Sequence, residues 1–303
     1  MTAASMTAPR VPFLARQERF ERVGSTNDVI RGWLADGERE VCLAVADEQT
    51  SGRGRHGRTW AAPARRALLL SLGFRPHWLP AERAWRIPAT VALAMADAAE
   101  EAAGLPDRAI RLKWPNDLVV ETAGPNAHLG AEIDADRARE RLGRRVELRK
   151  LGGVLAEADG IGSGDSRLVV GMGINADWPA SEFPTELAAG MSSLREASGG
   201  RPIDLARLLD AFILRLEPRI EALRGGWFDV ADWTERQATT GRVVRVELPS
   251  AAPLVARSPG VDALSGGLVI ADPAAPDGER TLVVGEVTSV RLDDPGVAVH
   301  AAV

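Results

Sequence analysis

The spacing of apolar segments changes near residue 238 and divides this chain of 303 residues into two parts. Before that point, short apolar runs alternate with longer segments of helical periodicity, which is typical of an α+β fold with a sheet and flanking helices. After it, only short apolar runs remain, separated by Gly, Pro and Asp. We therefore predict one large domain over residues 1–238 and a small all-β barrel over residues 239–303.

Three segments of the first part have the periodicity of amphipathic helices: 24–37, 86–104 and 204–223. Strands are predicted for the apolar runs between them: 41–48, 67–74, 109–121, 150–158 and 166–175. Pro115 interrupts one of these runs, and because proline cannot donate a ladder hydrogen bond, that run is predicted to form two short strands. The last two runs flank DGIGSGD, which predicts a hairpin.

Residues 121–149 are polar and highly charged, with little periodic apolar content, and we expect them to form a mobile surface insertion. The net charge of −5 does not favour non-specific DNA binding, so any basic patch is expected to meet a small anion. A single cysteine, Cys42, excludes an internal disulfide and a multi-cysteine zinc site. No signal-like or membrane-spanning apolar run is present, so we expect a cytoplasmic protein.

The segment TSGRGRHGRTW, residues 50–60, alternates arginines with glycines. Glycine permits positive φ and close approach to a ligand, and arginine binds phosphate or carboxylate oxygens through two parallel hydrogen bonds. By itself such a segment also suits nucleic-acid binding or a solvated loop. Because it lies between two predicted strands, and no GxxxxGK[ST] motif opens a helix there, we favour an anion site on a sheet.

Two further segments carry polar residues next to predicted strands: KWPND (113–117) and KLGGVLAE (150–157). Asn116 and Asp117 follow the bend at Pro115, and their oxygens suit a nucleotide and Mg²⁺. Lys150 precedes a pair of glycines, and an ammonium group there would help to bring anions together. Taken alone, KWPND also fits an ordinary turn, and Lys150 an exposed lysine at the end of a strand. GMGIN (171–175) does not match the dinucleotide fingerprint GxGxxG.

Taken together, these segments resemble the motifs of the biotin protein ligases, in order and at similar spacing. The motifs are STN at 25–27, GRGRHGRTW at 52–60, KWPNDL at 113–118, KLGGVLAE at 150–157 and GMGIN at 171–175. The resemblance extends over about residues 20–300, because GVDALSGGLVI and VVGEVTSVRL are similar to the C-terminal domain of that family. It implies a class II synthetase-like mixed sheet with flanking helices and a small SH3-like C-terminal barrel.

The resemblance also implies an activity: a biotin–protein ligase converts biotin and MgATP to biotinyl-5′-AMP and transfers biotin to a lysine of a biotin carboxyl carrier domain. The first step joins two anions, a carboxylate and a phosphate, and positive charge is needed to stabilise their approach.

The resemblance also implies roles for individual residues. It assigns Arg55 and Lys150 to catalysis. It assigns biotin binding to Ser25, Thr26, Gln49, Gly52, Arg53, Arg55, Lys150, Gly153, Leu155 and Gly171. It assigns ATP binding to Arg58, Trp60, Lys113, Asn116, Asp117 and Asn175, with Asp117 also a magnesium ligand.

Some properties of this family are not expected here. Nothing before residue 20 resembles a winged helix-turn-helix, so DNA binding is not expected, and neither is a membrane partner. His56 stands where relatives carry another basic residue and is left outside the predicted site. A homodimer is compatible with the sequence. Two other functions remain open: lipoate–protein ligase, which shares the catalytic fold in outline, and a non-enzymatic RNA-binding or scaffold protein.

Overall fold

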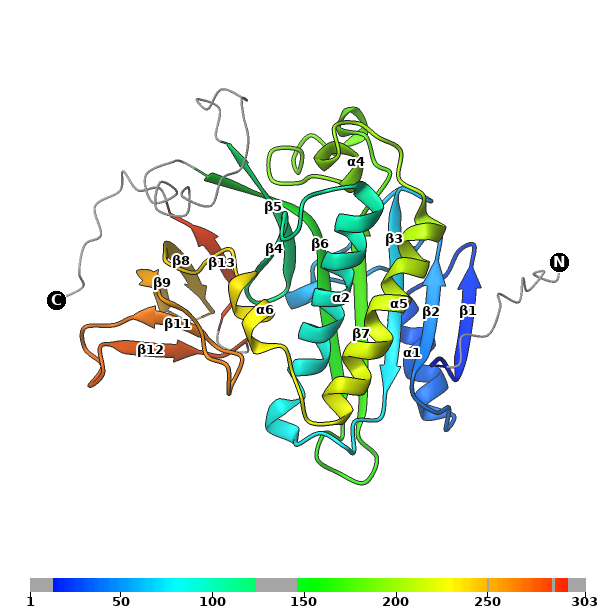
Figure 1. The fold of residues 1–303 in the computed structure, drawn as a ribbon, viewed down its shortest axis with the longest axis horizontal. Coiled ribbons are helices and arrows are strands. Elements are labelled where there is room, and N and C mark those ends of the chain that lie inside the picture. Colours follow the sequence, from blue (N-terminus) through cyan, green and yellow to red (C-terminus); the bar gives the residue numbers. More distant parts are fainter. Residues whose placement is uncertain (1–12, 124–145, 250, 285–286, 294–303) are drawn as a thin grey trace.

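A seven-stranded mixed sheet forms the centre of the molecule in the computed structural model, which describes residues 13–123, 146–249, 251–284 and 287–293 (Figure 1). The strand order is β1-β2-β3-β7-β6-β5-β4. Only β1 and β2 pair in parallel, and the other neighbours are antiparallel. The strands are β1 (Arg16–Phe20), β2 (Cys42–Ala46), β3 (Ala67–Phe74), β4 (Ile110–Lys113), β5 (Asp117–Ala123), β6 (Val146–Asp159) and β7 (Arg167–Asn175).

Helices cover the two faces of this sheet unequally. The long helices α2 (Arg86–Ala103) and α5 (Leu205–Arg224) pack together over one face, and α1 (Thr26–Ala35) lies on the other. The alternation along β2 explains this arrangement, because successive side chains of a strand point to opposite faces. Leu43 and Val45 join the core under α2 and α5, whereas Cys42 and Ala44 pack against α1. Helix α1 covers only part of its face of the sheet, and the uncovered part can accommodate a ligand.

The three predicted helices and the predicted strands of the first part are confirmed. Elements that the sequence did not reveal are β1, the short helices α4 (Leu194–Ala197) and α6 (Val230–Glu235), and a few 3₁₀ turns. Strand β1 has the sequence RQERF and lies at the edge of the sheet, half-exposed, so it lacks the apolar alternation that marks a strand. The helices α4 and α6 are too short to show a period.

The predicted insertion over 121–149 is wrong at both ends. Strand β5 continues to Ala123 and β6 begins at Val146, with Glu121 opposite Leu148 and Ala123 opposite Val146. Charged residues form strands here because β5 and β6 extend an existing antiparallel ladder beyond the apolar part of each strand. The rest of the predicted insertion, residues 124–145, lies outside the described residues.

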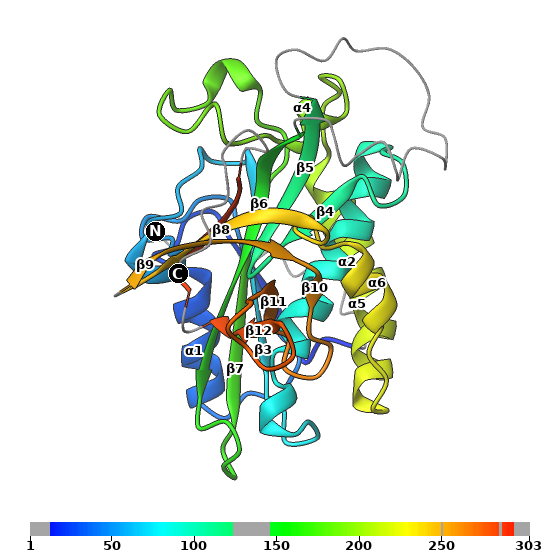
Figure 2. The same cartoon turned by 90° about the vertical axis from the view of Figure 1, so that its left-hand side faces the viewer.

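The C-terminal part is all β, as predicted, but its closure into a barrel is not confirmed. Its strands form two three-stranded antiparallel sheets, β13-β8-β9 and β10-β11-β12. The strands are β8 (Arg242–Leu248), β9 (Ala251–Ser258), β10 (Gly260–Val261), β11 (Leu268–Ala271), β12 (Glu279–Leu282) and β13 (Ser289–Leu292). Both views place these sheets beside the β4–β5 end of the large sheet (Figures 1 and 2).

Trp114, in the turn between β4 and β5, joins the large sheet to the C-terminal sheets. Its ring is 3% exposed and belongs to the C-terminal core, together with Val244, Leu268 and Val290. The indole nitrogen donates a hydrogen bond of 2.9 Å to the carbonyl of Gly266. The KWPND turn is therefore held from the side of the C-terminal sheets. None of the described helices combines the length and hydropathy needed to cross a lipid bilayer.

Candidate active site

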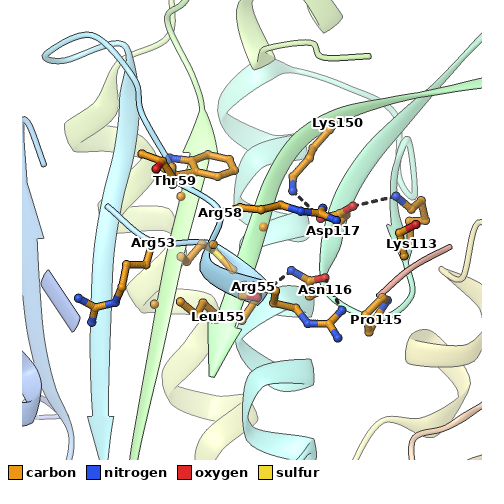
Figure 3. Close-up of a pocket in the computed structure, with 18 of the residues that line it drawn as sticks. Arg53, Arg55, Arg58, Thr59, Lys113, Pro115, Asn116, Asp117, Lys150 and Leu155 are labelled. Atoms are coloured by element: carbon orange, nitrogen blue, oxygen red, sulfur yellow. Dashed lines mark hydrogen bonds and ion pairs between the residues drawn. The ribbon is translucent and has the colours of Figure 1, made fainter. Parts of the chain in front are cut away.

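A cavity of about 340 Å³ opens on the α1 face of the sheet and collects most of the residues predicted for the site (Figure 3). It lies between the start of α1, the 52–60 loop, the β4–β5 turn, strands β5 to β7 and the C-terminal strand β13. The predicted residues that line it are Ser25, Thr26, Gln49, Arg53, Arg55, Arg58, Trp60, Lys113, Asn116, Asp117, Lys150, Gly153, Leu155 and Gly171. Segments separated by more than a hundred residues in the chain thus meet in one place.

Two predicted residues, Gly52 and Asn175, are not among the residues that line this cavity. Asn175 is 4% exposed, and its side-chain amide donates a hydrogen bond of 2.9 Å to the carbonyl of Ser192. Gly52 closes the base of the arginine loop. A Cβ atom at this position would lie 2.3 Å from the carbonyl oxygen of Trp60. Gly52 and Asn175 therefore pack behind the residues that line the cavity. Direct contact between either residue and a ligand stays a prediction.

One end of the cavity is neutral and polar. The Gln49 side-chain oxygen accepts hydrogen bonds from the Thr26 amide at 2.8 Å and the Thr26 hydroxyl at 3.0 Å. The buried Ser71 hydroxyl lies 2.7 Å from the Thr26 hydroxyl and donates to the Asn27 side-chain oxygen at 2.5 Å. Ser25 is the buried N-cap residue before α1, and its hydroxyl makes no capping bond. These groups can supply both donors and acceptors to a small polar ring.

The 52–60 loop lines the cavity and is held together by its own backbone hydrogen bonds. The amide of Gly54 donates to the carbonyl of Arg58 at 2.7 Å, and the amide of Trp60 donates to the carbonyl of Gly52 at 2.9 Å. A single 3₁₀ turn at residues 55–57 reverses the chain, with His56 at a φ of 55°. These backbone hydrogen bonds fix the shape of the loop without using the arginine side chains. The side chains can therefore make contacts on different sides of the loop.

Those arginines contact opposite sides of the site. Arg53 forms two hydrogen bonds to Asp28 of α1, at 2.7 and 2.8 Å, and lies 3.4 Å from Glu157 of β6. The hydrogen bonds from Arg53 lower the pKa of Asp28. Figure 3 shows Arg53 pointing away from the other labelled cations. Arg53 therefore ties the loop to α1 as well as lining the cavity.

Arg55 instead reaches the C-terminal sheets. One of its terminal nitrogens donates to the carbonyls of Val284 and Val287, at 2.9 and 3.1 Å, and the other lies 3.4 Å from the Asn116 side-chain oxygen. Burial lowers the pKa of this guanidinium, and the charge of Asp117 opposes that effect. Arginine nevertheless stays protonated in proteins, so Arg55 brings a full positive charge to this wall.

Asp117 organises the cationic end of the cavity. Its two oxygens contact the ammonium groups of Lys113 at 2.8 Å and Lys150 at 2.6 Å. Burial raises the pKa of this carboxyl, but the two neighbouring lysines outweigh that effect and hold the pKa below its ordinary value. One carboxylate thus orients two ammonium groups, and the trio keeps a net positive charge. With Arg55 and Arg58 on the facing wall, this end suits an anionic ligand.

Trp60 and the glycines of GMGIN form the floor of the cavity. The Trp60 ring lies directly over Gly173, where a Cβ atom would come within 2.6 Å of it. The ammonium of Lys150 is 5.4 Å from the centre of the same ring. A Cβ atom at Gly171 would lie 2.1 Å from the Asn27 side-chain oxygen. These glycines are therefore needed for close packing against the sheet.

The structure adds residues to the predicted set. Asn27, from the motif STN, lines the cavity, and its amide donates at 2.7 Å to Glu157 of KLGGVLAE, which is not among the lining residues. Thr288, Ser289, Val290 and Arg291, at the start of β13, also line the cavity. The segment VTSVR is similar to its counterpart in the family, but nothing in its local pattern shows that it reaches the cavity. Only the docking of the C-terminal sheets brings it there.

Comparison with known proteins decides the family. The model of the biotin/lipoate A/B protein ligase family matches residues 20–175, which is more than half of the chain. This chain belongs to the biotin/lipoate A/B protein ligase family. The resemblance drawn from the motifs is thereby confirmed, and the matched range contains all five of them.

Curated members of this biotin/lipoate ligase family include two informative relatives. The chain is 29% identical to a biotin–[acetyl-CoA-carboxylase] ligase of Mycobacterium tuberculosis, over 89% of this chain and 87% of that protein. It is 30% identical to the bifunctional ligase/repressor BirA of Bacillus subtilis, over 59% of this chain and 46% of that protein. The chain therefore matches most of the first relative and about half the length of the second.

Solved structures of the family share the fold. A biotin protein ligase from Aquifex aeolicus in complex with biotin and ATP has a TM-score of 0.68 and 24% identity, covering 92% of this chain and 99% of that one. A second structure of a biotin protein ligase from Aquifex aeolicus has a TM-score of 0.66 and 21% identity, covering 92% of this chain and 100% of that one. The predicted mixed sheet with flanking helices is therefore confirmed as the fold of this family.

Proposed function

We propose that this protein is a biotin–protein ligase, which activates biotin with ATP and attaches it to a lysine of an acceptor protein. The observation that carries the proposal is a single cavity with a neutral polar end at Thr26 and Gln49 and a cationic end around Asp117. A ligase that adenylates a carboxylic acid needs both ends, one for the acid's body and one for the phosphates. The relatives named as biotin ligases support the same activity.

Biotin fits the polar end. Its ureido ring carries one carbonyl and two N–H groups, which match the hydroxyls of Ser25 and Thr26 and the amide of Gln49. The apolar part of the molecule then lies along Leu155 and the glycine floor. In this orientation the carboxylate points toward Lys150, between the two ends of the cavity. The predicted biotin contacts at Gly153 and Gly171 are compatible with this orientation.

ATP fits the cationic end. Arg58, Lys113 and Lys150 face the phosphates, and the Trp60 ring offers a flat surface to the base. The indole N–H of Trp60 is buried beside Gly173, so the ring offers its face and not this N–H group to the nucleotide. Asn116 braces this wall, because its amide donates to the carbonyl of Val154 at 3.1 Å.

The first reaction forms a bond between a biotin carboxylate oxygen and the α-phosphorus, while the bond from that phosphorus to the bridging oxygen breaks and pyrophosphate leaves. Two anions must therefore meet, and their repulsion opposes the reaction. Lys150 and Arg55 reduce that repulsion and stabilise the charge that develops on the phosphate oxygens. Asp117 keeps both lysines in place before the substrates bind, so little reorganisation is needed.

Magnesium enters as part of the MgATP substrate in this proposal. Asp117 is the single carboxylate among the residues lining the cavity, and both its oxygens already contact lysines. No cluster of three metal-binding side chains occurs in the described parts of the chain. Mg²⁺ commonly keeps several waters and binds mainly through substrate phosphates. The residues present therefore fit an ion carried by the nucleotide, and the predicted Asp117 ligand would require one lysine to move.

The acceptor that we propose is a lysine of a biotin carboxyl carrier domain, in the cytoplasm. We further propose that residues 1–238 form the catalytic domain and that 239–303 form a second domain that completes the cavity through β13. A homodimer stays a prediction from the sequence.

Exchange of labelled pyrophosphate into ATP tests the adenylation step. We expect exchange that depends on biotin and is absent with lipoate, followed by transfer of labelled biotin to a purified carrier domain. Exchange with lipoate alone would instead identify a lipoate ligase. Retention of RNA with no exchange for either acid would reject an enzymatic function altogether.

A further inference from the structure

A second cavity adjoins the first, and most of the residues that line it have no role with biotin or ATP in the proposed function. Its volume is about 300 Å³, and it lies between the β4–β5 turn, helices α2 and α6, and the C-terminal sheets. The two cavities share Arg55, Pro115, Asn116 and Asp117 in their walls. The second cavity therefore meets the first at the cationic end, where the acid and the phosphate react.

The walls of the second cavity are mainly apolar. Helix α2 contributes Ala89 and Ala92, its N-cap residue is Trp85, and α6 contributes the buried ring of Trp233. The residues of the C-terminal sheets on this wall are Gly266 and the half-exposed Val284. Such a lining fits the hydrocarbon chain of a guest molecule and does not fit a second phosphate.

An uncharged polar atom of Gln237 in this wall has no hydrogen-bond partner among the described residues. Gln237 is 3% exposed, and its amide nitrogen donates to the carbonyl of Trp233 at 3.2 Å. Its side-chain oxygen is buried and accepts no hydrogen bond from any described residue. A buried acceptor without a partner is unfavourable, so a rotation of this side chain toward the cavity would let it accept a hydrogen bond from a guest that brings an N–H group.

Arg55 stands at the junction of the two cavities. It lines both, and its guanidinium is held by carbonyls of the C-terminal sheets and by Asn116. Attraction to the adenylate phosphate would draw this side chain into the first cavity. The same movement would widen the connection to the second cavity once biotinyl-AMP has formed.

We propose that the second cavity is the route by which the acceptor lysine reaches biotinyl-AMP, an inference that rests on the proposed ligase function. A lysine side chain has an apolar four-carbon stem and a terminal amine. The stem lies along Trp85 and Ala89, and the amine passes Arg55 to the acyl carbon. The nucleotide and the vitamin already fill the first cavity, so a third reactant needs an approach of its own.

The transfer step balances without any further reactant. The lysine ammonium releases one proton to solvent water and becomes a neutral amine, and its nitrogen then forms a bond to the acyl carbon of biotinyl-AMP. The bond between that carbon and the phosphate oxygen breaks, AMP leaves with the electron pair, and the nitrogen releases its second proton to solvent water. An apolar cavity favours the neutral amine, since desolvation disfavours the ammonium form.

The rim of the second cavity indicates where the acceptor protein sits. The side chain of Val284 is 44% exposed and that of Leu264 is 75% exposed. The carbonyl of Leu264 accepts a hydrogen bond from the indole N–H of Trp85, which lines the cavity. The side chains of Val284 and Leu264 leave apolar surface accessible to an acceptor protein beside the residues that line the cavity. The acceptor domain is therefore expected to rest on the C-terminal sheets while its lysine enters beneath them.

Two substitutions that narrow this route test the proposal. Ala89→Leu adds three carbon atoms on the α2 wall, and Ala156→Trp enlarges an exposed side chain on the β6 wall of the same cavity. We expect biotin-dependent pyrophosphate exchange to stay within about twofold of wild type, while single-turnover transfer from preformed biotinyl-AMP to a carrier domain falls at least about tenfold. Ala102→Leu is the matched control, since Ala102 is a partly buried residue of the same helix that does not line the cavity.

Hydroxylamine can replace the acceptor lysine as the amine that reacts with biotinyl-AMP, and it is small enough to pass a narrowed cavity. It therefore distinguishes a variant whose route is blocked from one whose reaction site is damaged. Its reaction with biotinyl-AMP is expected to change little in both variants. Normal transfer to the carrier in both variants, or an equal loss with carrier and hydroxylamine, would overturn the inference. Absence of biotin-dependent exchange in the wild-type protein would instead reject the proposed function itself.

Discussion

At the scale of single residues, the charge of the cavity depends on pairings that cross between strands. Asp117 at the start of β5 contacts Lys113 at the end of β4 and Lys150 on β6. The three side chains come from adjacent strands, so the carboxylate holds both lysines against one wall. Removing one of these three side chains leaves a neighbouring charge without its ion-pair partner at a partly buried position.

Asp117→Asn should lower stability in a pH-dependent way. At pH 7 we expect the free energy of unfolding to fall by about 1–3 kcal/mol, less than for a fully buried pair, because the lysine side chains are 20% and 38% exposed. The folded state lowers the pKa of Asp117, so its contribution is complete above the usual carboxyl pKa of about 4 and is lost as the pH falls through the folded value.

Urea unfolding at pH 7 and at pH 3.5 measures this effect. The difference between wild type and Asp117→Asn should shrink at the lower pH. The exposed Asp36→Asn is a suitable control. A difference that stays constant between the two pH values would show that the carboxylate charge is not responsible.

Arg55→Ala and Lys150→Ala should each slow adenylate formation by about a hundredfold or more, because each removes one cation that faces the developing phosphate charge. Both side chains are partly exposed at a cavity wall, so the melting temperature should change by only a few degrees. Pyrophosphate exchange measures the first effect and thermal unfolding the second. Arg39→Ala, at an exposed position, is the control. Wild-type exchange rates in both variants would remove these residues from the catalytic assignment.

At the scale of elements, the 52–60 loop is shaped by backbone bonds and by the absence of a side chain at its base. Its amides at Gly54 and Trp60 bond within the loop, while Arg53 and Arg55 tie it to α1 and to the C-terminal sheets. The loop therefore connects three parts of the molecule, and a small change at its base alters the position of every cation it carries.

Gly52→Ala is expected to impair ligand binding more than folding. The new Cβ atom would lie 2.3 Å from the backbone oxygen of Trp60, so the loop must open. We expect the KM for biotin and for ATP to rise about tenfold, the equivalent of about 1.4 kcal/mol, with little change in melting temperature. Gly54→Ala is a close control, because its nearest neighbour would lie 3.5 Å away. Equal kinetics for the two variants would contradict this account of the loop.

At the scale of the whole molecule, the C-terminal sheets act as part of the site. They hold Arg55 through the carbonyls of Val284 and Val287, and β13 lines the first cavity. Trp114 anchors the KWPND turn in the C-terminal core, and Arg242 of β8 contacts Glu121 of β5 at 2.9 Å. Displacing these sheets would therefore disturb the wall of the first cavity that carries Arg55 and Asn116.

Trp114→Ala should destabilise the protein and its site together. Loss of this buried ring is expected to cost about 3–5 kcal/mol, and the hydrogen bond to Gly266 is lost with it. Because the ring joins the large sheet to the C-terminal sheets, we expect urea unfolding to separate into two transitions. Trp227→Ala, at a ring that is 58% exposed, is the control. A single transition at the wild-type midpoint would contradict this role of Trp114.

Much of the fold could be predicted because its signals are local. Helical periodicity and apolar runs mark α1, α2, α5 and most strands, and Pro115 marks the β4–β5 turn. Strand β1, with the sequence RQERF, could not be predicted, since it becomes a strand only by pairing with the buried β2. The extent of β5 and β6 was also missed, because continued pairing outweighs the polar composition of the chain there.

The sequence by itself determined which chemical groups the site would contain, because the motifs place arginines, lysines, amides and glycines in short segments whose local structure is readable. Only the tertiary structure decided how those groups are paired. It brought Asp117 to Lys150, Arg53 to Asp28 and Arg55 to the C-terminal carbonyls, and it left Asn175 outside the cavity. Strand order and domain docking create these contacts between residues far apart in the chain, and no local pattern encodes the distance between them.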